Sequence, residues 1–99
     1  MISSTEFETN KWVKTGNHEW TRLGVTVKST GIFYHIKFKY DNPSSCYFSL
    51  FKQLDETSMS SLMASIKEGV SYILKTQSYS KRVTQKYKRT LNNWLYVNW

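Results

Sequence analysis

The sequence predicts an α+β domain in which an antiparallel sheet of about four strands is followed by two C-terminal helices. Residues 32–40 alternate between apolar and polar side chains, and flanking stretches alternate similarly, which is typical of half-buried strands. From residue 56 onward the apolar side chains recur at helical spacing instead. A chain of 99 residues has room for one hydrophobic core, so residues 1–99 are predicted to form a single domain, with the sheet over about 6–52.

The stretch 32–40 is predicted to be the central strand. Neighbouring side chains of a strand point to opposite faces, so this strand has one apolar face and one basic, partly aromatic face. The apolar face carries Ile32, Tyr34, Ile36, Phe38 and Tyr40. The opposite face carries Phe33, His35, Lys37 and Lys39.

The other strands are predicted in chain order around it. An irregular alternation indicates a first strand at 7–13, and a turn at 15–18 leads into a second strand at about 20–28. A tight hairpin at 29–31 connects that strand to the central one. After the central strand, the stretch 41–45 contains the only proline and is predicted to be a loop.

The apolar pattern also assigns faces to the second strand. Val25 and Val27 would face the core, while Arg22 and Lys28 would share the basic face of the central strand. A fourth strand is predicted at residues 46–51, but both of its faces carry bulky side chains. The pattern therefore leaves its inward and outward faces open.

The first helix is predicted over residues 56–76, with Asp55 as a suitable N-cap. Gly69 interrupts its apolar stripe, and a short strand at 70–74 is the alternative because these residues also alternate. The stripe stays in helical phase beyond the glycine, which favours one continuous helix.

A second, basic helix is predicted over about 81–96. Its apolar face would carry Val83, Tyr87, Leu91, Trp94 and Leu95. Its first half carries Lys81, Arg82, Lys86, Lys88 and Arg89. Because cations near a helix N-terminus oppose the helix dipole, we expect them to serve a partner rather than the fold.

Positive charge is concentrated in the last third of the chain. Residues 69–99 contain six Lys and Arg and no acidic residue, whereas residues 1–68 contain eight Lys and Arg and seven Asp and Glu. Nearly all of the net charge of +7 therefore lies after residue 68. Such segregation favours a polyanionic partner, with a solubilising surface as the alternative.

The sequence shows no motif of a catalytic, metal or cofactor site. His18 and His35 lie on different predicted elements, Cys46 is alone, and neither paired carboxylates nor a glycine-rich phosphate loop is present. We therefore predict a protein that is not an enzyme and needs no cofactor or metal. RNA cleavage involving His35, as in small ribonuclease toxins, stays open as an alternative.

The composition also bears on location. A single cysteine suits a reducing compartment, the N-terminal residues lack the features of a signal peptide, and no apolar run approaches the ~20 residues of a membrane span. We predict a cytoplasmic or nucleoid- or nucleus-associated protein that is neither secreted nor bound to a membrane.

A nucleic-acid surface needs cations that neutralise phosphates and exposed rings that stack on bases. The basic face of the sheet and the basic helix supply both, with Phe33 as a stacking ring unless a helix or partner chain covers it. The predicted site consists of Arg22, Lys28, Phe33, His35, Lys37, Lys39, Lys81, Arg82, Lys86, Lys88 and Arg89.

Three stretches within residues 6–70 also carry a family resemblance. They are Glu19-Trp20-Thr21-Arg22-Leu23, the hairpin Ser29-Thr30-Gly31, and Phe48-Ser49-Leu50 through Leu54-Asp55 to Met59 and Leu62. In this order they resemble the whirly-type single-stranded-DNA-binding domain of the transcriptional positive-coactivator family. The resemblance implies a homodimer whose strands carry single-stranded nucleic acid, with contacts at Arg22, Lys28, Lys37 and Lys39. Relative to that family, Pro43-Ser44-Ser45 replaces a glycine- and lysine-rich stretch, and the second helix is an addition.

The sequence thus predicts a non-catalytic, regulatory nucleic-acid-binding protein that prefers single-stranded DNA or RNA. An alternative from another class is a small phage or mobile-element inhibitor whose basic helix binds an acidic surface of a host protein. A ribonuclease toxin is the second alternative.

Overall fold

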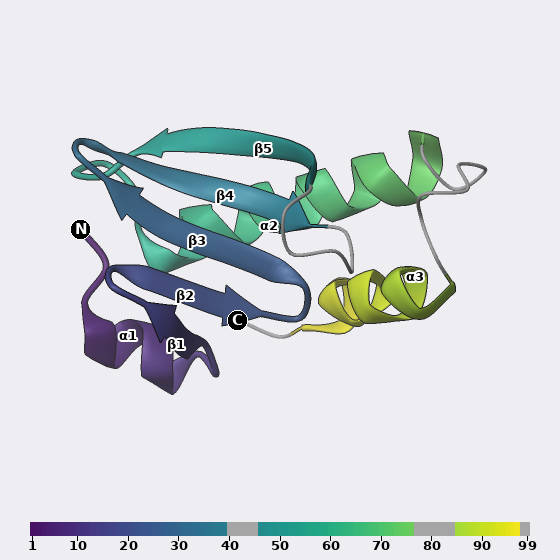
Figure 1. Ribbon diagram of the computed structural model, residues 1–99, viewed down its shortest axis with the longest axis horizontal. Helices are drawn as coiled ribbons and strands as arrows, with labels where there is room; N and C mark the ends of the chain where they lie inside the picture. The colour runs from purple at the N-terminus through teal and green to yellow at the C-terminus, as the bar shows by residue number, and fades with distance from the viewer. Residues whose placement is uncertain (40–45, 77–84, 98–99) are drawn as a thin grey trace.

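The protein folds into a five-stranded antiparallel sheet with its helices packed on one face (Figure 1). This computed structural model describes residues 1–39, 46–76 and 85–97, with the side chains of residues 39 and 46–48 excepted. The α+β class and the antiparallel sheet are confirmed, and the sheet has five strands rather than about four. The elements are α1 (Ser4–Thr9), β1 (Val13–Gly16), β2 (Glu19–Arg22), β3 (Val25–Thr30), β4 (Phe33–Lys39), β5 (Cys46–Gln53), α2 (Met59–Thr76), α3 (Gln85–Asn92) and the 3-10 helix η1 (Asn93–Tyr96).

The strands follow one another across the sheet in chain order, so each pairs with its neighbour in sequence. β4 lies between β3 and β5 and is an interior strand, although β3 rather than β4 is the middle strand of the five. Val25 pairs with Phe38 and Val27 with Ile36, and all four side chains are buried. The predicted apolar face is therefore confirmed for this part of the sheet.

The helices of the described chain lie on that apolar face. In Figure 1 the strands pass in front of α2, so the viewer looks onto the opposite face of the sheet. Phe7 of α1 stacks on Trp20 of β2, with 5.0 Å between ring centroids and 7° between ring planes. Trp94 of η1 is fully buried, and its indole N–H donates to the carbonyl oxygen of Leu23 at 2.9 Å. None of these described helices covers the other face, which we call the open face.

The predicted first strand at 7–13 is wrong, because its beginning belongs to α1. The Ser3 hydroxyl accepts a hydrogen bond from the backbone N–H of Glu6 at 3.1 Å and so caps this helix. Serine followed three residues later by glutamate is a helix-start pattern that the irregular alternation obscured. Phe7 and Trp12 are buried by the helix and the turn after it, and β1 begins only at Val13.

The predicted second strand at 20–28 is in fact two strands. Leu23 and Gly24 have φ values of 45° and 77°, which turn the chain back on itself between β2 and β3. The next hairpin also lies later than predicted, because β3 continues to Thr30. Ile32 follows that strand and is 68% exposed, so its predicted place in the core is wrong. Tyr40 and the loop 41–45 lie outside the described residues.

α2 is one continuous helix through Gly69, as favoured by the sequence, and the alternative strand at 70–74 is wrong. Its start lies at Met59 rather than residue 56, and Ser58 rather than Asp55 supplies the cap. The Ser58 hydroxyl accepts from the Ser61 N–H at 3.2 Å, while the Ser58 N–H donates to the Ser61 hydroxyl at 2.9 Å. This reciprocal pair resembles a capping box built from two serines.

The predicted second helix is shorter in its described part. α3 ends at Asn92 and continues into η1, while residues 81–84, including Val83, lie outside the described residues. Tyr87, Leu91 and Trp94 are buried as predicted. Leu95 is exposed, because the change from α to 3-10 geometry alters which side chains share a face.

Candidate nucleic-acid interface

The open face carries a cluster of three rings on β4 and β5. Cross-strand pairing places His35 opposite Phe51, and Phe33 opposite Gln53. The His35 and Phe51 rings stack with centroids 4.3 Å apart and planes 10° apart, and Phe33 meets Phe51 edge-on at 6.1 Å. Phe33 is 37% exposed and Phe51 is 59% exposed. We call Phe33, His35 and Phe51 the aromatic cluster.

Two lysines lie beside this cluster on the same face. Lys28 of β3 pairs with His35, and Lys37 follows two residues after His35 along β4. Neither lysine side chain makes a hydrogen bond or ion pair with another residue of the described part of the chain. Glu19 pairs with Lys28 across β2 and β3, and its carboxylate accepts a hydrogen bond from the Thr15 hydroxyl at 3.0 Å. The face thus offers two cations and one acid around three rings.

His35 contributes a neutral ring to this surface. Burial of the imidazole lowers the pKa of His35, and the nearby positive charge of Lys37 lowers it further. Its Nε2 atom is covered by protein and has no hydrogen-bond partner among the described residues. The imidazole is therefore uncharged near neutral pH and acts chiefly through its flat surface.

Arg22 does not belong to the open face, contrary to the prediction. The turn at Leu23 and Gly24 reverses the chain, so Arg22 pairs with the buried Val25 and shares its face. Its guanidinium lies 5.4 Å from the centre of the Trp94 ring, and burial lowers the pKa of Arg22. The prediction treated residues 20–28 as one strand. In such a strand Arg22 and Lys28 would face the same side, because their positions differ by an even number of residues.

The basic helix also lies apart from the aromatic cluster. Tyr87 of α3 donates from its hydroxyl to the Gly24 carbonyl at 3.4 Å, which fixes α3 beside the β2–β3 turn. The cluster lies toward the opposite end of the strands, near the β3–β4 turn (Figure 1). The two predicted halves of the site are thus separated by most of a strand length, about 20 Å for six residues.

The basic residues of the second helix have different environments. Lys86 and Arg89 are exposed, and Lys88 is half-buried. Lys81 and Arg82 lie outside the described residues, as does the side chain of Lys39. The structure therefore brings together Lys28, Phe33, His35 and Lys37 of the predicted set.

Phe51 is the member of the cluster that sequence reasoning missed. Bulky residues on both faces of β5 made its orientation ambiguous, and its partner depends on the register between β4 and β5. Only the alternation of Ser49, Phe51 and Gln53 hinted that one face of β5 is the more polar.

Neither a metal cluster nor a membrane helix is found in the part of the chain that the structure describes. No three His, Cys, Asp or Glu side chains there are grouped to hold a metal ion. None of the described helices has the length and apolar character needed to cross a membrane.

The chain matches no protein-family model, and comparisons with curated proteins and with solved structures gave no significant match.

Proposed function

We propose that this chain binds single-stranded nucleic acid on the open face of its sheet, with the aromatic cluster as the stacking surface. The observation that supports this most strongly is that the rings of Phe33 and Phe51 are exposed on an uncovered face of the sheet. Phenylalanine side chains are more often buried in the core. Stacking of a base on an exposed ring contributes ~1–3 kcal/mol and tolerates any sequence.

The geometry favours single strands over duplexes. Bases within a duplex are already stacked on one another, so rings on a sheet surface reach only unpaired bases. Lys28 and Lys37 beside the cluster would neutralise phosphates of the bound strand, and the net charge of +7 would attract it from a distance. DNA and RNA both satisfy these requirements.

The proposal assigns His35 a stacking role and no catalytic one. A general base needs an accessible nitrogen within hydrogen-bond reach of its substrate. The Nε2 atom of His35 is covered by protein, and burial, with a further contribution from Lys37, lowers the pKa of His35 and disfavours the protonated form that would serve as an acid. These features support a binding protein over a ribonuclease toxin.

Three wider parts of the proposal rest on the sequence. They are the regulatory role, the homodimer implied by the whirly-type resemblance, and a cytoplasmic or nucleoid- or nucleus-associated location. Sedimentation velocity across a range of protein concentrations tests the homodimer, which predicts a concentration-dependent shift to twice the monomer mass.

Fluorescence anisotropy with labelled single-stranded DNA, single-stranded RNA and duplex DNA tests the central proposal. We expect tighter binding of the single strands, and Phe51→Ala should weaken it by about 5- to 150-fold, the equivalent of one lost stack. Tyr72→Ala is the matched control, because Tyr72 is also a well-exposed aromatic but lies on α2 in the helix layer. Equal effects of the two substitutions, or no effect of either, would reject the stacking surface.

The position of α3 favours a second candidate function. Lys86 and Arg89 are exposed at the end of the sheet remote from the aromatic cluster, and there they would bind an acidic protein surface independently of that cluster. If this inhibitor-like function is correct, Lys86→Gln with Arg89→Gln should abolish binding to an acidic peptide. Phe51→Ala should leave that binding unchanged.

A further inference from the structure

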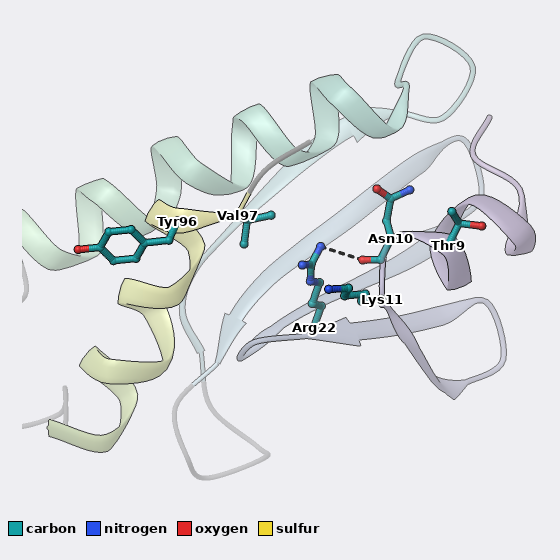
Figure 2. A pocket seen from close by; sticks show the side chains of 6 residues that line it. All are labelled: Thr9, Asn10, Lys11, Arg22, Tyr96 and Val97. Atoms are coloured by element: carbon teal, nitrogen blue, oxygen red, sulfur yellow. Dashed lines mark hydrogen bonds between the residues drawn. The ribbon is translucent and has the colours of Figure 1, made fainter.

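A pocket lies on the helix side of the sheet, away from the open face. It is a pocket of about 390 Å³ between the end of α1, the end of β2 and the residues that follow α3 (Figure 2). This volume is within the range of small-molecule sites, about 300–1,000 Å³. Its lining residues are Thr9, Asn10, Lys11, Arg22, Tyr96 and Val97. Two of these are cations and none is acidic.

The Arg22 guanidinium is held in place at this pocket and keeps donors to spare. One of its nitrogens donates to the Asn10 carbonyl at 2.8 Å (Figure 2), and the group lies over the Trp94 ring. That is the one hydrogen bond the guanidinium makes within the described part of the chain. A guanidinium carries five N–H donors in a rigid fork, which suits two-point binding of a phosphate group.

Lys11 supplies a second cation from a constrained position. Its φ of 66° is left-handed, and its backbone N–H donates to the Glu8 carbonyl at 3.0 Å in the turn after α1. The side chain is exposed and makes no hydrogen bond or ion pair with another described residue. Lys11 therefore places an exposed ammonium group beside the guanidinium of Arg22 (Figure 2).

Tyr96 and Val97 border the pocket, and the Tyr96 ring points away from Arg22 and Lys11 (Figure 2). The Tyr96 side chain is 81% exposed. Recognition at this pocket therefore depends on the phosphate group rather than on the group that carries it.

From this arrangement we infer that the pocket binds a phosphate monoester, such as that of a nucleotide. Arg22 and Lys11 would contact the phosphate. The inference is independent of the proposed function, because Arg22 lies on the helix side of the sheet and the aromatic cluster on the open face. The phosphate could belong to a free nucleotide or to the end of a nucleic-acid strand, since both present the same group.

Isothermal titration calorimetry with adenosine 5′-monophosphate tests the inference, with adenosine as the ligand that lacks phosphate. We expect saturable binding of the monophosphate only, weakened about tenfold by Lys11→Gln, which removes one charge-assisted contact. Lys14→Gln is the matched control, because Lys14 is an exposed lysine three residues away that does not line the pocket. Tyr96→Ala should leave the affinity for the monophosphate unchanged, because its ring points away from the two cations.

Arg22→Lys should also weaken the monophosphate, and a melting curve will show whether that variant is folded. Because Arg22 supports the fold as well, the exposed Lys11 provides the decisive comparison. Equal weakening by Lys11→Gln and Lys14→Gln, or absence of saturable binding to the unaltered protein, would overturn the inference.

Two further titrations compare a short oligonucleotide that bears a 5′-phosphate with one that ends in a 5′-hydroxyl. A preference for the phosphorylated strand that Lys11→Gln removes supports the pocket and assigns it to strand ends. Equal affinity for the two strands, together with binding of the free monophosphate, supports the pocket and assigns it to nucleotides. Phe51→Ala should leave the monophosphate affinity unchanged in either case, so failure of this inference and failure of the proposed function are distinguishable.

Discussion

Gly69 lies against the ring of Phe38 where α2 packs on β4. A Cβ atom at position 69 would overlap the Phe38 ring, and both residues are buried. A glycine inside a helix ordinarily costs ~1 kcal/mol relative to alanine. Here the absent side chain allows close approach of helix and sheet, so the same residue contributes to packing.

Replacement of this glycine should therefore reverse the usual effect of alanine in a helix. We expect Gly69→Ala to lower the free energy of unfolding by ~1–3 kcal/mol through overpacking against Phe38. Urea denaturation measures this, with Ser71→Ala as the control at an exposed position of the same helix. A stability gain for Gly69→Ala would show that the ring of Phe38 moves aside freely.

His35 should make stability depend on pH. Its folded pKa lies below the ordinary value of 6.5, so the folded chain binds this proton less readily than the unfolded chain. The contribution of neutral His35 to the free energy of unfolding is fully present above the pKa of the unfolded chain. It is lost as the pH falls from that pKa to the lower pKa of the folded chain. His35→Phe keeps a ring beside Phe51 and removes this titration.

Urea denaturation at about pH 7.5 and about pH 5.5 gives the comparison, since this interval spans the ordinary histidine pKa. We expect the unaltered protein to lose more stability than His35→Phe between the two values. An identical loss in both would contradict a lowered pKa for His35.

At the scale of elements, α3 lies at the end of the sheet remote from the aromatic cluster. If a bound strand extends along the sheet to this helix, Lys86 and Arg89 would contact its phosphates. Replacing both with Gln should then reduce the salt dependence of single-strand affinity by about 1.4 in the logarithmic slope, or about 0.7 per phosphate. Lys14→Gln should leave the slope unchanged. An unchanged slope in the double variant would restrict the contact to the open face.

The elements that follow from local pattern were predictable. Alternation identified β4, and the apolar stripe identified α2 and the buried side of α3. The predictions that were wrong concern places where a single residue reverses the chain or caps a helix. The left-handed conformation of Leu23 is rare for a leucine, so alternation continued across the turn and joined β2 to β3. Ser3 and Glu6 marked the start of α1, but the alternation after them favoured a strand.

At the scale of the whole molecule, the open face depends on pairing between strands. Parity alone placed Phe33, His35 and Lys37 together, because they belong to one strand. Phe51 could not be assigned, since its place beside His35 follows from the register of β4 with β5. Arg22 was assigned to the wrong face because the chain reverses between β2 and β3. The reversal pairs Arg22 with Val25, so both side chains lie on the same face.

The two faces of the sheet should separate stability from binding. Phe38→Ala should lower the free energy of unfolding by ~3–5 kcal/mol, because it leaves a cavity between the sheet and α2. Phe33→Ala should cost much less stability yet weaken single-strand binding, because its ring is partly exposed. Urea denaturation with anisotropy on the same samples measures both quantities. The opposite pattern would invert the assignment of the faces.

The most direct test of binding on the open face is a ¹H–¹⁵N NMR titration of the full chain with a short single-stranded oligonucleotide. We expect the amide signals of β4 and β5 around Phe33, His35 and Phe51 to shift most, while those in the middle of α2 stay in place. Shifts confined to α3 or to α2, with the signals of β4 and β5 unmoved, would contradict the claim that this face carries the nucleic acid.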